Sequence, residues 1–161
     1  MPDSSLLLLL NEVRGKTLRL LDGVSEKEAR RSPRWLQNHI VWHAGHCYVL
    51  VESLAMEAIG QQPQIPNGWF EMFSWKSNPG QVAPDQWPTL VQVVSHLADQ
   101  HRRLRQAIEP LTEGQLSSMA PGDSGRPVRY AIVHGLHDEA CHSGEIWLLR
   151  KMMRSSESGS H

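Results

Sequence analysis

Two short segments far apart in the chain are rich in histidine and are candidates for binding a metal ion. The first carries three histidines at spacings of four and three residues: His39, His43 and His46. The second carries two histidines and an aspartate at spacings of four residues: His134, Asp138 and His142. Side chains three or four positions apart lie on one face of a helix. Imidazole and carboxylate groups gathered in this way suit Zn²⁺, Ni²⁺ or Fe²⁺, with Zn²⁺ the leading candidate.

His43 and His142 are the central members of this set, because both fall on the apolar stripe of their helical pattern. An isolated polar group is costly to bury, so the two histidines favour either a shared hydrogen-bonded network or the coordination of an ion. Asp138 lies one turn before His142 and is expected to join them. His137 lies about 140° around the helix from His142 and is not expected to share the site. The residues alone leave both a metal site and a metal-free polar core open.

The elements that position these residues are amphipathic helices, expected over 4–21, 33–59, 87–108 and 127–154. In each of them apolar residues recur at spacings of three and four. The second helix is expected to begin at Pro33, with Ser32 as its cap, because proline is favoured in the first turn. A short helix is expected after Ser25, which starts a capping box. No strand pattern interrupts them, so the sequence predicts an all-α four-helix bundle.

The second and third helices are joined by a long connection, residues 60–86, which is rich in glycine and proline. Its segment 69–75 carries four aromatic residues: Trp69, Phe70, Phe73 and Trp75. Connections of this length usually cross over a bundle or line a site, and such aromatics need a surface on which to pack. This segment is therefore expected either to cover the end of the bundle or to grip a ligand or a second subunit.

Length and composition indicate an ordinary globular protein. The 161 residues fit a single domain, expected over 1–154, followed by a disordered polar tail over 155–161. A formal net charge of −1 argues against nucleic acid as a partner. The leucine run at 6–10 is soon followed by charged residues, so neither a membrane span nor a signal peptide is expected, and the protein is predicted to be cytoplasmic. Cys47 and Cys141 form no close pair and are expected to be buried apolar residues.

Two motifs carry a resemblance to a known family. Residues 35–46 on the second helix, and residues 136–146 on the last helix with their His142-Ser-Gly-Glu-Ile146 ending, resemble the DinB-like superfamily. The resemblance implies a four-helix bundle, commonly a homodimer, in which many members bind a divalent metal through three histidines. Some members of that superfamily are transferases that use low-molecular-weight thiols.

Carried over by position, the resemblance assigns the metal ligand of the second helix to His43 and the last ligand to His142. The middle position holds Asp138, where the family usually has histidine. A His-Asp-His set still suits Zn²⁺ or a harder divalent ion. His46, one turn beyond His43, is the candidate replacement ligand, and His137 is adjacent to Asp138 but points elsewhere on the helix.

Two functions are compatible with these features. The first is a metal-dependent thiol transferase or hydrolase, in which the ion lowers the pKa of a bound thiol or water and Glu139 or Glu145 is a candidate base. The second is a non-enzymatic dimeric bundle with a metal-free polar core and a binding or stress-response role. The leucine run at 6–10 and the aromatic segment 69–75 are the candidate dimer surfaces. A DNA-binding role is disfavoured by the charge and by the lack of a recognition helix.

Overall fold

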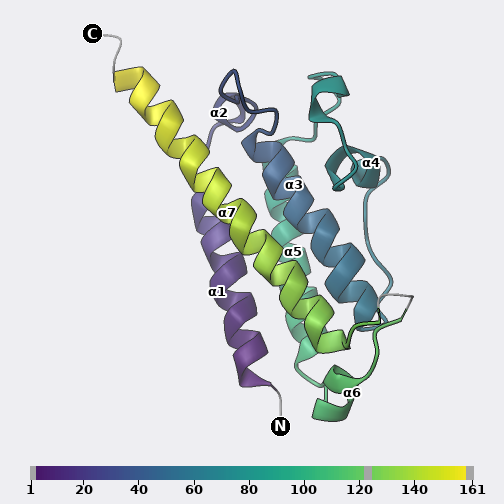
Figure 1. Ribbon diagram of the computed structural model, residues 1–161. Helices are drawn as coiled ribbons and strands as arrows, with labels where there is room; N and C mark the ends of the chain where they lie inside the picture. Colours follow the sequence, from purple (N-terminus) through teal and green to yellow (C-terminus); the bar gives the residue numbers. More distant parts are fainter. Residues whose placement is uncertain (1–2, 122–124, 159–161) are drawn as a thin grey trace.

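The computed structural model describes residues 3–121 and 125–158, and within these ranges it is helical apart from one isolated bridge between Met119 and Pro127. Its long helices lie side by side in Figure 1: α1 (Ser4–Leu21), α3 (Ile40–Val51), α5 (Leu90–Ile108) and α7 (Val128–Ser158). Shorter helices connect them: α2 (Glu26–Ala29), α4 (Trp69–Phe73) and α6 (Glu113–Ser117). α1 and α3 each contact both α5 and α7, so the long helices enclose one interior. The prediction of an all-α fold is confirmed.

The starts of α1 and α5 follow from their capping residues. Asp3 caps α1, and its carboxylate accepts two backbone hydrogen bonds in the first turn, at 3.0 and 3.1 Å. The chain turns after α1 at Gly23, whose φ of 69° favours glycine. α5 begins at Leu90, later than the expected residue 87, because Thr89 and Gln92 form a capping box there.

The second long helix begins later than the sequence predicts. α3 starts at Ile40 rather than at Pro33, and His39 is its N-cap, with the ring Nδ1 accepting a hydrogen bond from the Trp42 amide at 3.1 Å. The residues before it form one turn, closed by the Leu36 amide on the Pro33 carbonyl, and then an irregular stretch. Leu36 is 40% exposed, so a helix in this stretch gains little from burial, whereas the imidazole cap stabilises a start at Ile40.

α3 continues directly into a π-helical segment, η1 (Glu52–Met56). Such segments insert an extra residue into a helical turn and are frequent at functional sites. Glu52 is completely buried at its start, where its carboxylate meets residues of α5. Helical conformation continues to residue 58, close to the expected end at residue 59.

The long connection is more ordered than the sequence predicts, because it contains α4 and a 3₁₀ turn, η2 (Pro79–Gln81). α4 packs against α3. Trp69 and Phe73 are buried in this contact, whereas Phe70 and Trp75 are 38% and 55% exposed. Burial of two large rings holds the segment in place despite its glycines and prolines.

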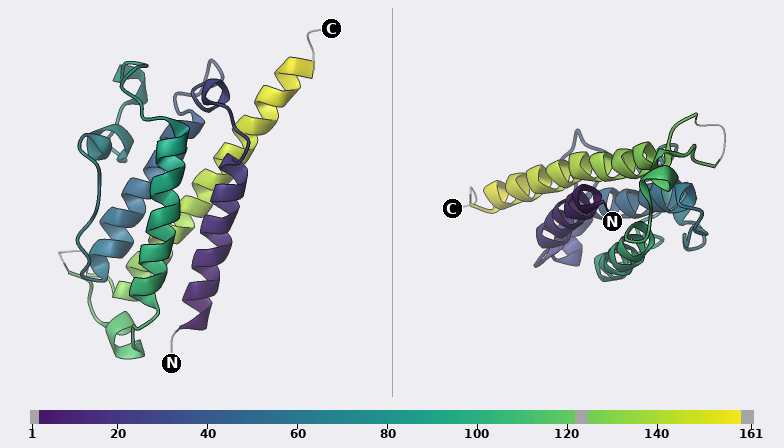
Figure 2. Two further views of the ribbon diagram at one scale, coloured as in Figure 1. Left: turned by 180° about the vertical axis from the view of Figure 1, so that it is seen from behind. Right: turned by 90° about the horizontal axis from the view of Figure 1, so that it is seen from below.

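α7 is the longest helix and projects past its neighbours (Figure 1, Figure 2). It reaches Ser158, so residues 155–158, which the sequence predicts to be disordered, are helical. The helix continues because no glycine or proline follows Arg154 before Gly159. Residues 159–161 of the expected tail lie outside the described residues. No helix in the described ranges combines the length and the apolar character needed to cross a bilayer.

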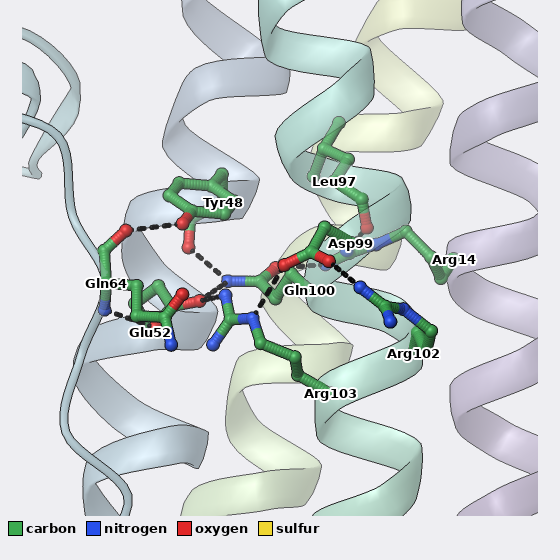
Figure 3. A network of polar contacts seen from close by, with 9 residues as sticks. All are labelled: Arg14, Tyr48, Glu52, Gln64, Leu97, Asp99, Gln100, Arg102 and Arg103. Carbon is green, nitrogen blue, oxygen red and sulfur yellow. Dashed lines mark hydrogen bonds and ion pairs between the residues drawn. The ribbon is translucent and has the colours of Figure 1, made fainter.

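A network of buried polar side chains crosses the interior (Figure 3). Arg14 of α1 donates to both carboxylate oxygens of Glu139 on α7, at 2.7 and 2.8 Å. It also donates to the side-chain oxygen of Gln100 at 2.7 Å and to the Leu97 carbonyl at 2.6 Å, both on α5. Arg14 and Glu139 are 1% and 0% exposed, so this ion pair depends on its hydrogen bonds rather than on water.

The same network reaches α3 and the long connection. Gln100 donates its amide to the Tyr48 carbonyl at 2.9 Å and to Glu52 at 2.8 Å. Glu52 also accepts hydrogen bonds from the Arg103 side chain and, at 2.8 Å, from the Gln64 backbone amide. All carboxylate oxygens of the two buried glutamates therefore have a donor. Among the described residues, Arg103 Nη1 is the buried nitrogen of the network that has no hydrogen-bond acceptor.

Candidate metal centre

Facing turns of α3 and α7 bring five side chains together: His43, His46, Asp138, His142 and Glu145. His142 is central, with its ring centroid 4.5 Å from that of His46 and 5.1 Å from that of His43. The α7 residues share one face because they follow one another at spacings of four and three. The four ligands proposed from the sequence thus lie close together, and they are joined by Glu145, which the sequence marks only as a candidate base.

The first of two groups consists of His46, Asp138 and His142. Asp138 Oδ2 lies 3.4 Å from His46 Nε2 and 3.3 Å from His142 Nε2. These distances are long for hydrogen bonds between charged groups. Within the described residues, Asp138 Oδ2 is buried and has no hydrogen-bond partner. A carboxylate oxygen therefore faces two ring nitrogens without a strong bond to either.

The second group consists of His43, His142 and Glu145. Glu145 Oε2 lies 2.9 Å from His43 Nδ1 and 3.0 Å from His142 Nδ1, and these two nitrogens are 2.9 Å apart. An Nδ1–H group on His142 can serve both its contact with Glu145 Oε2 and its hydrogen bond with His43 Nδ1, so we assign the ring proton of His142 to Nδ1. The hydrogen bonds of this group therefore need no proton beyond those that the neutral rings carry.

The hydrogen bonds of the rings determine which nitrogens are free. His46 Nδ1 donates to the Phe73 carbonyl at 2.6 Å, which leaves a lone pair on its Nε2. His142, with its proton on Nδ1 toward Glu145, also has a lone pair on Nε2. Two imidazole lone pairs therefore face the unbonded oxygen of Asp138. Three such atoms repel one another unless an additional proton or a cation lies between them.

The spacing of the first group fits a tetrahedral metal ion. Ligand atoms about 2.1 Å from Zn²⁺ in tetrahedral geometry lie roughly 3.4 Å from one another. The two separations from Asp138 Oδ2, 3.3 and 3.4 Å, agree with this value. Those of the second group, 2.9 and 3.0 Å, are instead typical of hydrogen bonds. The residues of the first group therefore fit a divalent ion.

The charges in the site also favour a cation. Without an ion, hydrogen bonds from the protonated His142 and His46 rings, together with their positive charge, hold the pKa of Asp138 well below its usual range. A cation between these groups would act in the same direction. The His43 ring lowers the pKa of Glu145, and burial lowers the pKa of His43 itself. Burial opposes protonation of His142 as well, but the Asp138 and Glu145 carboxylates outweigh it and raise the pKa of this ring. Two ionised carboxylates thus flank the histidines at neutral pH.

Comparison with protein families gives a match over most of the chain. The family model of the DinB superfamily matches residues 9–146, a stretch that includes all five side chains of the site. The chain belongs to the DinB superfamily. The resemblance seen in the motifs at 35–46 and 136–146 is therefore confirmed. No curated protein gives a match.

In this DinB protein the positions that the family resemblance marks as ligands are divided between the two groups. Asp138 and His142 occur together in the first group, as the resemblance implies, but their partner there is His46. His43 faces Glu145 in the second group. Within the described residues, the group that contains the aspartate thus includes His46 of α3 and not His43.

The long connection of the DinB protein orients His46. The Phe73 carbonyl that receives the His46 proton belongs to α4, and the Phe73 ring lies directly on Gly45. A Cβ at residue 45 would approach this ring to 2.3 Å, so glycine is required for the close contact. The Trp42 ring stacks on the His46 ring, with their centroids 4.8 Å apart, and its Nε1 donates a hydrogen bond to Ser77 Oγ at 2.9 Å. The sequence did not reveal this anchor, because a backbone carbonyl has no sequence signature.

Other candidate groups lie outside the centre. His134 stacks on Tyr130 at 5.6 Å, and His137 is exposed, as its position on the helix predicts. Glu139, the other candidate base, is bonded to Arg14 and buried away from any substrate.

The two cysteines differ in exposure. Cys47 is buried, as expected, whereas Cys141 is exposed, so the prediction that both are buried is wrong for Cys141. The reason is that residue 141 lies about 200° around α7 from the inward-facing Glu139. Burial raises the pKa of the Cys47 thiol well above its ordinary value, so this thiol stays protonated and is unreactive.

A cavity of ≈ 260 Å³ adjoins the second group. His43 and Glu145 lie on its border, together with the amide side chains of Gln37 and Asn38. Leu36 and two leucines of α7 complete the lining. The cavity gives a small molecule access to the histidines, with polar groups on one side and apolar groups on the other.

Proposed function

We propose that this DinB protein binds one divalent metal ion through His46, Asp138 and His142, within a four-helix bundle of the DinB type. The observation that carries the proposal is the buried Asp138 oxygen, which faces two imidazole nitrogens and has no hydrogen-bond donor among the described residues. Nitrogen and oxygen ligands in this arrangement favour Zn²⁺, with Ni²⁺ and Fe²⁺ as the alternatives. Three protein ligands leave a further position open, which is characteristic of catalytic sites.

His43 and Glu145 support this site from the second group. Glu145 holds the Nδ1 proton of His142 and so keeps Nε2 free for the ion, as carboxylates often do beside histidine ligands. The Glu145 side chain is 56% exposed and borders the cavity. It is therefore the group best placed to accept a proton from a molecule bound there.

The activity we propose is that of a metal-dependent transferase or hydrolase, with a low-molecular-weight thiol as a candidate substrate. A bound divalent ion supplies Lewis acidity, which lowers the pKa of a thiol or water. The chain's own residues provide the rest: the cavity orients the substrate, and Glu145 accepts the proton that the nucleophile loses.

Elemental analysis tests the metal site directly. Protein purified without an affinity-metal step is expected to contain one divalent ion per chain, or to take up one Zn²⁺ after treatment with chelator. His46→Ala and His142→Ala are expected to lose this ion. His137→Ala is the matched control, since it removes an exposed histidine of α7 and should keep the full metal content.

His43→Ala distinguishes the two groups. If the first group holds the ion, this variant keeps it with an affinity lowered by at most about 10- to 100-fold, the usual effect of losing a supporting residue. Loss of the ion from His43→Ala with retention in His46→Ala would assign it to the second group instead. Wild-type protein that takes up no metal would favour the non-enzymatic alternative.

A further inference from the structure

Two cavities follow one another along α7 beside the candidate metal centre. The inner one is the ≈ 260 Å³ cavity bordered by His43 and Glu145. The outer one is a second cavity of ≈ 220 Å³, bordered by Trp35 and Met153. Neighbouring residues line the two cavities, since Leu36 borders the inner cavity and Trp35 the outer one. On α7, the residues that line them follow one another at spacings of three and four, so the two cavities adjoin along one face of this helix, and we treat them as one groove.

The sides of the groove are mainly apolar. α7 contributes Leu148 and Leu149 to the inner part and Met152 to the outer part. The irregular stretch before α3 forms the opposite wall, where Trp35 and Leu36 are 76% and 40% exposed, and Leu148 is 48% exposed. Adjacent exposed apolar side chains around a cavity are typical of ligand sites.

The charged groups of the groove lie at its two ends. Glu145 borders the inner end, and Arg31 borders the outer end. The Arg31 guanidinium makes no hydrogen bond or ion pair with any described residue. From Glu145 to Met153, α7 advances by about 12 Å, which is close to the length of an extended chain of roughly ten carbon atoms.

We propose that this groove binds an elongated small molecule with an apolar body and a carboxylate at the Arg31 end. The planar guanidinium of arginine matches a carboxylate with two parallel hydrogen bonds. The ionised Glu145 disfavours a second anionic group at the inner end, where Gln37 and Asn38 suit an uncharged polar group. The inference rests on the proposed function only in taking the end beside His43 as the reacting end, because binding in the groove does not require the metal.

Calorimetric titration of full-length, chelator-treated protein with straight-chain carboxylates tests the proposal. Decanoate, kept below its micelle concentration, is expected to bind one per chain. Hexanoate and octanoate are expected to bind more weakly, by about threefold for each methylene group removed. Decanol is expected to bind at least about tenfold more weakly than decanoate, because it has no charge to pair with Arg31.

Two pairs of variants locate the binding. Arg31→Gln is expected to weaken decanoate about tenfold and to leave decanol unchanged, whereas Arg34→Gln, an exposed arginine outside both cavities, should have no effect. Leu148→Asn is expected to weaken all three carboxylates. Val91→Asn, which alters an apolar side chain of α5 that is 74% exposed, is its control.

Equal affinities along the carboxylate series, or equal decanoate binding by wild-type protein and Arg31→Gln, would overturn the proposal. So would sedimentation data in which wild-type protein is a dimer that Leu148→Asn dissociates, because the groove would then be covered by a second copy of the chain. The protein in these titrations is metal-free, so a negative result from elemental analysis leaves them unaffected. Failure of decanoate to bind likewise leaves the metal analysis of His46→Ala intact.

Discussion

Two buried polar regions lie against α7, and they differ in the balance between donors and acceptors. In the network around Arg14, both oxygens of Glu139 receive hydrogen bonds, at 2.7 and 2.8 Å. In the histidine site, Asp138 Oδ2 faces two ring nitrogens at 3.3 and 3.4 Å and has no donor among the described residues. Arginine always carries its protons, whereas a neutral imidazole leaves one of its two ring nitrogens as an acceptor. A buried region with enough donors stabilises the fold, and one with surplus acceptors is suited to bind a cation.

The largest effect is expected from breaking the first region. Arg14→Met leaves the Glu139 carboxylate buried without its partner and should lower the free energy of unfolding by about 3–5 kcal/mol. Urea denaturation measures this, with the exposed Arg19→Met as control, expected within about 0.5 kcal/mol of wild type. The double variant Arg14→Met with Glu139→Leu should recover part of the loss. A single variant as stable as wild type would show that the ion pair is not structural.

For the histidine site, a bound metal ion rather than the loss of a charge should change the free energy of unfolding. Zn²⁺ at about a hundredfold excess over its Kd should raise the free energy of unfolding by about 2.7 kcal/mol, because it binds only the folded chain. Chelator should reverse this shift, and His142→Ala should abolish it. Thermal unfolding with and without chelator is the measurement. A wild-type Tm that is indifferent to both additions would contradict a metal site.

A subtler change sharpens the contrast by altering the support of the site without removing a ligand. Gly45→Ala forces the Phe73 ring away from α3 and loosens the carbonyl that holds His46, so we expect Zn²⁺ affinity to fall by about 10- to 100-fold. Competition with a chromogenic chelator measures the affinity. Gly144→Ala is the matched control, because a Cβ there meets nothing within 4 Å and should leave binding unchanged. Similar Zn²⁺ affinities in both variants would show that α4 does not hold His46 in position.

The smallest expected effect tests whether the first region excludes water. Burial raises the pKa of Tyr48 to about 12. Since this folded-state value lies above that of the unfolded chain, Tyr48 contributes stability that is present below pH ~10 and is lost as the pH rises toward 12. Tyrosinate absorbance in a Tyr130→Phe variant, in which Tyr48 is the single tyrosine, measures this titration. Half-ionisation near pH 10 would show that the phenol is solvated.

The sequence predicted the helical fold and the meeting of α3 with α7 because both depend on regular spacing. It missed the start of α3, where an imidazole cap and the exposure of Leu36 outweigh the preference for proline in the first turn. It also gave no sign of the network, since Arg14 and Gln100 lie among other polar and charged residues that are not buried, and nothing in the sequence sets these two apart. Their burial becomes favourable only when the partners on other helices are in place.

For the site, spacing identified the residues but not their partners. His43 and His46 are one turn apart on α3, and both can face His142. The choice between them depends on Glu145 and on the Phe73 carbonyl, which lie on other elements. Such contacts between elements depend on side-chain rotamers and on the path of the long connection, neither of which follows from helical periodicity.

The Phe73 carbonyl has a consequence for how this protein tolerates mutation. A peptide oxygen is present whichever amino acid occupies residue 73, so its chemistry cannot be removed by a single substitution. A single substitution can displace this oxygen, however, because the close approach of α4 depends on the missing side chain at Gly45. A saturation screen for metal retention should therefore find position 45 restricted to glycine, while position 73 accepts several large apolar residues. The hydrogen bond to His46 therefore depends on Gly45, a residue that is neither its donor nor its acceptor.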